Sequence, residues 1–135
     1  MAIVDFPPIY EADEHGLLAV GGDLELSSLL LSYSRGIFPW PISEEFPLAW
    51  FSPDPRGLLF TDKLHLSKSL NKVLNKKKFQ VKINQNFEQV IRECALAKNR
   101  KDGQGTWITQ NIIQAYSRLF QAGYAYSVET HNIQT

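Results

Sequence analysis

Ile37-Phe38-Pro39-Trp40-Pro41 and Trp50-Phe51-Ser52-Pro53-Asp54-Pro55-Arg56 are the most conformationally restricted stretches of this 135-residue chain. Both combine aromatic side chains with prolines. Because proline fixes φ and lacks an amide proton, these stretches favour rigid loops and short strands, which we expect over 48–51 and 57–60. The second stretch is interpreted as architectural, with the Asp54 carboxylate pinning the turn and Arg56 pairing with it.

The segments on either side predict a mixture of helices and strands. Expected helix N-caps have side chains that accept backbone N–H bonds, namely Ser27 or Ser28, Ser67, Asn86 and Thr109. Gly36 and Gly123 are the expected helix stops. Strands are expected over 17–20, 79–84 and 124–130, a basic helix over 68–77, and a polar loop over 98–105. This order of elements predicts an α/β (α+β) fold.

Apolar stripes mark the two helices that follow Asn86 and Thr109. The first places Cys94 on its apolar face, so Cys94 is predicted to be a core residue rather than a nucleophile. The second has an apolar stripe made of Ile112, Ile113, Tyr116, Leu119 and Phe120. The final predicted strand is followed by His131-Asn132, which favours a turn. An edge strand leaves backbone donors and acceptors unpaired, so we expect this sheet to be incomplete.

Charge is distributed unevenly although the net charge is zero. Residues 1–62 contain ten acidic residues and two arginines, whereas residues 63–135 contain twelve basic residues and four acidic ones. The same boundary separates two predicted domains, an N-terminal α/β domain over 1–62 and a second, incomplete domain over 63–135. This asymmetry predicts that the two parts attract each other, or that the second binds a polyanion, and the two readings are compatible.

Composition excludes several other classes of protein. No apolar run reaches the roughly 20 residues that a membrane-spanning helix needs. The N-terminus has no basic segment followed by an apolar one, as a secretory signal would. The single cysteine, Cys94, excludes an internal disulfide and a multi-cysteine zinc site, and three scattered histidines do not form a metal set. The cytoplasm is the expected compartment.

Five segments, in order, carry a resemblance to one known family. They lie at residues 16–24, 33–40, 50–56, 64–69 and 105–109, and include Gly36-Ile37-Phe38-Pro39-Trp40 and the Trp50 to Arg56 string. On these residues the chain resembles leucyl/phenylalanyl-tRNA–protein transferase over nearly its whole length. The resemblance implies an enzyme that moves Leu or Phe from aminoacyl-tRNA to proteins with N-terminal Arg or Lys, marking them for the bacterial N-degron degradation pathway.

The resemblance also implies a fold and a set of roles. The family has a small N-terminal α/β domain and a larger domain similar to the GNAT acetyltransferases, and needs no metal or dissociable cofactor. Its pattern continues beyond the point matching Thr135, where the groups that organise the acceptor amine are expected, so no catalytic residue is assigned within this chain. Tyr33, Trp40 and Trp107 are implied to line the site for the aminoacylated 3′-terminal adenosine. They are alternatively core aromatics, although the prolines on both sides of Trp40 fix its direction.

Lysines dominate residues 63–82, a stretch that contains no acidic residue. Lys68, Lys72 and Lys76 lie at i, i+4 and i+8 and therefore share one helical face, where like charges oppose each other. An anionic partner would relieve that repulsion, and the family resemblance implies that these residues bind tRNA. The alternatives are a solvated helix face or a partner for the acidic part of the chain.

Three functional hypotheses follow from the sequence. The first is the aminoacyltransferase. The second is a catalytically inactive tRNA-binding remnant that keeps the lysines and aromatics but lacks amine-activating groups. The third is a structural or regulatory fragment that pairs its exposed sheet edge with another chain.

Overall fold

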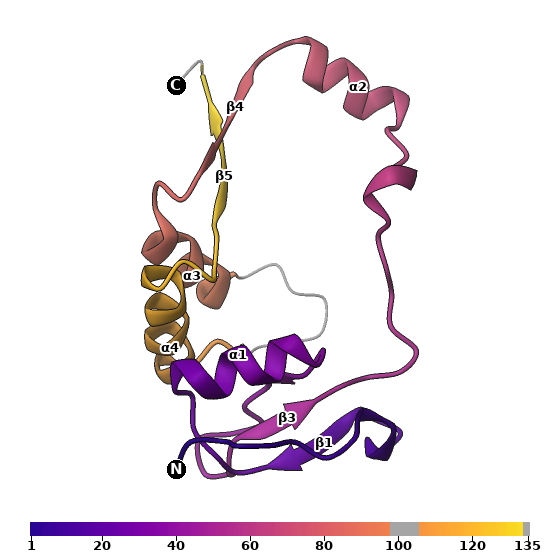
Figure 1. Ribbon diagram of the computed structural model, residues 1–135. Helices are drawn as coiled ribbons and strands as arrows, with labels where there is room; N and C mark the ends of the chain where they lie inside the picture. Colours follow the sequence, from indigo (N-terminus) through magenta and orange to yellow (C-terminus); the bar gives the residue numbers. More distant parts are fainter. Residues whose placement is uncertain (98–105, 134–135) are drawn as a thin grey trace.

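Helices and strands alternate along the computed structural model, which describes residues 1–97 and 106–133 (Figure 1). In chain order the elements are η1 (Ile9–Glu11), β1 (Leu17–Val20), α1 (Leu26–Ser34), β2 (Phe38–Pro39), β3 (Ala49–Phe51), η2 (Thr61–Lys63), α2 (Lys68–Asn75), β4 (Phe79–Ile83), α3 (Phe87–Leu96), α4 (Gln110–Gln121) and β5 (Val128–Asn132). The predicted α/β (α+β) fold is confirmed. The likeness to acetyltransferases stays a prediction, and the polar loop predicted over 98–105 lies outside the described residues.

Three short strands form an antiparallel sheet with β3 at its centre. Trp50 of β3 pairs with Ala19 of β1 on one side and with Pro39 of β2 on the other. The strand predicted over 17–20 is confirmed, and the one predicted over 48–51 begins one residue later. The strand predicted over 57–60 is wrong, because no described strand pairs with these residues.

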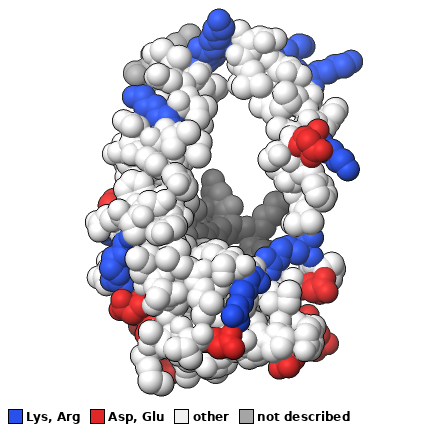
Figure 2. All heavy atoms as spheres, in the orientation of Figure 1, with Lys and Arg blue, Asp and Glu red and all other residues white. Residues whose placement is uncertain are grey.

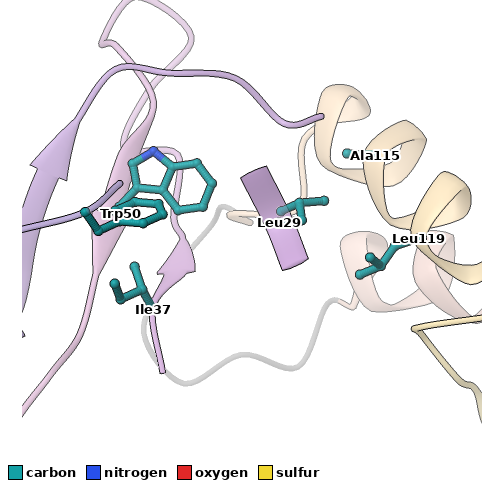
Figure 3. Close-up of a cluster of buried hydrophobic side chains, with 6 residues drawn as sticks. Leu29, Ile37, Trp50, Ala115 and Leu119 are labelled. Atoms are coloured by element: carbon teal, nitrogen blue, oxygen red, sulfur yellow. The ribbon is translucent and has the colours of Figure 1, made fainter. Parts of the chain in front are cut away.

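Helix α1 lies between this sheet and α4. The shared core joins side chains from both ends of the chain and consists of Phe6, Leu29, Ile37, Trp50, Ala115 and Leu119 (Figure 3). Trp50 is 1% exposed, and its indole N–H donates to the Gly21 carbonyl at 2.9 Å. Trp50 is therefore architectural, as predicted. The predicted Arg56–Asp54 pair is wrong, because the Arg56 guanidinium instead donates to the Gly36 carbonyl at 2.9 Å.

The predicted start of α1 is wrong, whereas its predicted end is confirmed. Its start is not capped by Ser27 or Ser28: the helix begins at Leu26, and the Ser28 hydroxyl is buried, donating to the Asp23 carboxylate at 2.7 Å. Its end is stopped by Gly36, as predicted. Gly36 has φ +73°. Its amide donates to the Tyr33 carbonyl at 3.2 Å, and the Ile37 amide donates to the Ser32 carbonyl at 2.9 Å. This is the arrangement that glycine permits at a helix C-terminus.

The predicted caps of α2 and α4 are confirmed. The Ser67 hydroxyl accepts from the Leu70 amide at 3.2 Å, and the Thr109 hydroxyl accepts from the Ile112 amide at 3.3 Å. The cap predicted for α3 is wrong, because the Asn86 side chain makes no capping bond. Instead, the Glu129 carboxylate of β5 accepts from the Asn86 amide at 3.1 Å and from the Gln85 amide at 3.3 Å, just before the helix.

A second, two-stranded sheet forms from β4 and β5, which run antiparallel. Strand β5 begins later and ends later than the predicted 124–130. It includes His131-Asn132, so the turn predicted there is wrong. Figure 1 shows this ribbon extending away from the β1–β3–β2 sheet, with α2 on the far side of an open region. Within the described part of the chain, no helix has the length and apolarity to cross a bilayer.

Helix α3 packs against α4 through one aromatic pair. The rings of Phe87 and Phe120 stack with centroids 4.4 Å apart. Phe87 is the one residue of α3 that is buried. Cys94 is exposed, so its predicted place in the core is wrong: of the α3 residues only Phe87, one of the two stacked rings, is buried.

Candidate functional site

The three aromatic residues predicted to bind an aminoacyl-adenosine lie in one cluster. The indoles of Trp40 and Trp107 stack with centroids 5.0 Å apart and an interplanar angle of 16°. Trp40 directly follows β2, and its amide donates to the Ala49 carbonyl of β3 at 2.9 Å. Trp107 precedes the Thr109 cap of α4. The stack therefore joins the segment after β2 to the segment that leads into α4, and Trp40 remains 44% exposed.

Tyr116 joins Tyr33 to this stack. The Tyr33 and Tyr116 hydroxyls share a hydrogen bond between α1 and α4, and the Tyr116 ring lies 6.2 Å from that of Trp107 at 74°. The sequence placed Tyr116 among core residues, and it is in fact partly buried on that stripe. A tyrosine at a core-facing position needs a partner for its hydroxyl, which is the signal that would have pointed to this role.

Both phenols are held in their neutral form. Burial raises the pKa of Tyr33. Burial also raises the pKa of Tyr116, and the neighbouring Tyr33 raises it further. Neutral phenols donate and accept hydrogen bonds but do not serve as bases near pH 7. The pair is therefore suited to positioning a bound group and to orienting the Trp107 ring.

An open cavity of about 600 Å³ is lined by Pro41, the residue after Trp40, and by Thr109, two residues after Trp107. Its walls come from three places, the loop after β1, the loop between β2 and β3, and the first turns of α4, and the residues are Gly22, Asp23, Leu24, Pro41, Ser43, Glu44, Phe46, Leu48, Thr109, Gln110, Asn111 and Gln114. The Ser28 hydroxyl holds the pKa of Asp23 below its ordinary value, so this carboxylate is ionised. The lining combines apolar groups with amides and two acids, and suits a polar or cationic organic group rather than a phosphate.

The predicted tRNA-binding lysines are not part of this cluster. Lys68, Lys72 and Lys76 are all exposed, the first two within α2 and the third as its C-cap. Figure 1 places α2 at the opposite end of the molecule from the β1–β3–β2 sheet. In Figure 2 several basic side chains lie at that end, whereas acidic ones gather at the other.

Ion pairs do not join the acidic and basic parts of the chain within the described residues. The four pairs found there are all local to one part, including Arg35 with Asp5 and Arg92 with Glu88. None of them involves a lysine. Among the described contacts, therefore, no ion pair joins the α2 lysines to the acidic N-terminal part.

Comparisons with known proteins give one consistent answer. Family models described as leucyl/phenylalanyl-tRNA protein transferase and as its N-terminal domain match residues 58–135 and 22–54. A leucyl/phenylalanyl-tRNA–protein transferase of Flavobacterium johnsoniae is 52% identical over 92% of this chain and 58% of its own length. That of Idiomarina loihiensis is 49% identical, over 95% and 54% respectively. The chain thus spans about half the length of the curated relatives it matches.

Proposed function

We propose, because this chain belongs to the leucyl/phenylalanyl-tRNA–protein transferase family, that it takes part in moving Leu or Phe from aminoacyl-tRNA to proteins with N-terminal Arg or Lys. The observation that carries the proposal is the Trp40–Trp107 stack, in which Trp40 is 44% exposed. The products would enter N-degron degradation, and the reaction would take place in the cytoplasm, where aminoacyl-tRNA is available.

The aromatic cluster is assigned to the aminoacylated 3′ end of the tRNA. Trp40 is 44% exposed, and we assign the terminal adenine to a stack on its accessible part; such stacking contributes about 1–3 kcal/mol per base. Tyr33 and Trp107 complete the wall, with Tyr116 holding both in place. We assign the acceptor to the cavity of about 600 Å³, whose wall includes the Glu44 carboxylate, a group that favours a cationic acceptor over the anionic tRNA. The Asp23 carboxylate of the same wall already pairs with the Met1 ammonium at 3.3 Å.

The reaction needs no further reagent. The acceptor α-amine attacks the carbonyl carbon of the aminoacyl ester, an amide bond forms, and the ester C–O bond breaks. The ribose hydroxyl of the tRNA is the leaving group and takes up the proton that the amine loses. The enzyme therefore contributes chiefly by holding ester and amine in reacting geometry and by assisting the proton transfer.

The basic helix is assigned to the tRNA acceptor stem. Lys68, Lys72 and Lys76 face solvent with no described carboxylate partner, so phosphates would neutralise them. Contacts of this kind are independent of base sequence and weaken with salt. We retain 1–62 as the N-terminal domain and 63–135 as the beginning of the GNAT-like domain in the same proposal.

A transfer assay tests the proposal directly. Radiolabelled Phe-tRNA is mixed with this chain and a peptide that begins with Arg, and the same peptide with an acetylated N-terminus is the control. Labelled product from the free peptide alone is the expected result. The second candidate is a tRNA-binding protein without transfer activity. Salt-dependent tRNA binding with no labelled product would select that candidate, and absence of binding would reject both.

A further inference from the structure

The segments 36–40 and 50–56 meet at the Gly36 carbonyl, and Arg56 joins them there. The Arg56 guanidinium donates to this carbonyl at 2.9 Å, and the Ser52 hydroxyl donates to it at 3.3 Å. Ser52 is itself fixed, because it is 6% exposed and its amide donates to the Gly16 carbonyl at 2.7 Å. Arg56 therefore ties the segment that follows β3 to the turn between α1 and β2.

The Arg56 guanidinium also lies over an aromatic ring of β2. Its Cζ atom is 5.8 Å from the centroid of the Phe38 ring, which is within the range where a cation is attracted to a ring face. The Phe51 ring stacks against the same ring, with centroids 6.5 Å apart and an interplanar angle of 23°. Phe38 is therefore held by its strand partner Phe51 and by Arg56 together.

Phe38 in turn contacts Trp40. Residues two apart on an extended segment lie on the same side, and these two rings meet edge to face with centroids 6.3 Å apart. Ile37 and Pro39 alternate with them and are fully buried. Burial of these two side chains fixes the backbone of β2. The direction of the Trp40 indole therefore depends on the neighbours that share its own side.

We propose that Arg56 is a positioning residue for Trp40 in the aromatic site. Its guanidinium holds the Gly36 carbonyl and the Phe38 ring, and these restrain the indole that stacks on Trp107. A planar guanidinium suits this role, because it donates hydrogen bonds in its plane while its face covers an aromatic ring. The proposal rests on the proposed function in one respect, which is that Trp40 binds the aminoacyl-adenosine.

Arg35 provides a natural contrast to Arg56. The two are the basic residues of segment 1–62, and Arg35 directly precedes Gly36. The Arg35 guanidinium pairs with the Asp5 carboxylate, whereas the described ion pairs do not include Arg56. Arg35→Ala therefore removes the same charge beside the same turn without removing a described contact to Phe38 or to the Gly36 carbonyl.

Circular dichroism reads the position of Trp40 without any ligand. Two stacked indoles absorb as a coupled pair, and the resulting couplet depends on the distance and angle between them. Trp40→Phe identifies the couplet by removing it. Arg56→Ala is expected to reduce the couplet by roughly half or more, because one hydrogen bond that favours the stacked position is lost. Arg35→Ala should leave it unchanged.

Two results of this experiment would overturn the proposal. The first is a couplet in Arg56→Ala equal to that of the unaltered chain. The second comes from Phe38→Leu, which removes the ring between the guanidinium and the indole and keeps Arg56 in place. This variant should also reduce the couplet, and it provides the test if Arg56→Ala does not fold. An unchanged couplet in Phe38→Leu would show that the ring does not restrain Trp40.

A double-mutant cycle shows whether Arg56 acts through Trp40. Arg56→Ala is expected to weaken binding of amide-linked 3′-phenylalanyl-adenosine by about two- to tenfold, because fewer molecules hold Trp40 in the binding position. In the Trp40→Ala background the same change should cost no further affinity. Equal losses in the two backgrounds would overturn the proposal. Unchanged affinity in Trp40→Ala alone would reject the proposed adenine site, and the couplet would then decide the role of Arg56 separately.

Discussion

The Tyr33 hydroxyl shares a hydrogen bond with the Tyr116 hydroxyl, which joins the last turn of α1 to the middle of α4. The two residues are 83 positions apart in the chain. Tyr116 also meets the edge of Trp107, whose indole stacks on Trp40. The position of the tryptophan stack therefore depends on how α1 and α4 pack against each other.

Removing the hydroxyls of this pair tests its contribution. In Tyr33→Phe the more buried Tyr116 hydroxyl loses its partner, whereas in Tyr116→Phe the half-exposed Tyr33 can bind water. An unsatisfied buried group costs about 1–3 kcal/mol and the loss of an ordinary hydrogen bond about 0.5–1.5 kcal/mol. We expect Tyr33→Phe to lower the free energy of unfolding more, as measured by urea denaturation. The double variant should lose less than the two single losses together, and strict additivity would show that the bond contributes nothing.

Removing one indole tests the proposed adenine site. Trp40→Ala is expected to weaken binding of an amide-linked 3′-phenylalanyl-adenosine by about 1–3 kcal/mol, because one stacking surface is removed. Isothermal titration calorimetry measures the affinity. Tyr126→Ala is the control, since Tyr126 is an aromatic residue that is 69% exposed outside the cluster. Unchanged affinity in Trp40→Ala would remove Trp40 from the site.

Neutralising the α2 lysines tests the proposed tRNA interface. The triple variant Lys68→Ala, Lys72→Ala, Lys76→Ala should bind tRNA more weakly. The slope of log affinity against log salt should fall by roughly 2–3, which is about 0.7–0.9 for each phosphate that is no longer neutralised. The helix itself should be no less stable, because repulsion between like charges is removed. Arg118→Ala is the control for removal of a positive charge outside α2, and it should change the slope by far less than the triple variant does. A salt slope equal to that of the unaltered chain would show that α2 does not bind phosphates.

Glu129 makes stability depend on acidic pH. The Ser127 hydroxyl, at 2.6 Å, and the Asn86 and Gln85 amides hold the pKa of Glu129 below its ordinary value of 4.5. Its contribution is therefore fully present above that ordinary pKa and is lost as the pH falls through the lower, folded-state pKa. Glu129→Gln should reduce the free energy of unfolding at pH 7 more than at pH 3, because the contribution of the carboxylate fades as the pH falls below 4.5.

Urea denaturation at the two pH values measures this difference. Glu93→Gln is the matched control, because Glu93 lies on α3 and borders the same cavity of about 410 Å³ as Glu129. An equal loss of stability at pH 3 and pH 7 in Glu129→Gln would contradict the prediction.

Gly16 and Gly123 separate steric clash from backbone strain. Both have φ +85°, a conformation that costs residues with a Cβ about 1–2 kcal/mol. A Cβ at Gly16 would also lie 2.8 Å from the Pro53 Cα, whereas one at Gly123 would meet nothing within 4 Å. Gly16→Ala should therefore destabilise the protein distinctly more than Gly123→Ala in thermal denaturation. Equal effects would mean that Pro53 moves away freely.

Several elements of the fold were predictable because the interactions that form them are local. Ser67 and Thr109 cap helices through an amide three residues later, and Gly36 stops α1 through bonds within the same turn. These interactions depend on residue type at fixed short spacing, so the order of side chains is enough to specify them. The stacked Trp40 and Trp107 were likewise predicted to belong to one site, although from resemblance rather than from spacing.

The order of residues alone predicted the mixture of helices and strands, the helix ends that have local caps, and the family, and it contains the uneven charge distribution. Packing between distant segments placed the Tyr116 hydroxyl against Tyr33, and it set Glu129 in place of the Asn86 side chain at the start of α3, across 43 residues. The same packing left Cys94 exposed and turned the apolar face of β4 outward. Periodicity shows which residues share a face of a helix or strand. Which neighbour covers that face depends on contacts between distant segments, and those contacts exist only after the chain has folded.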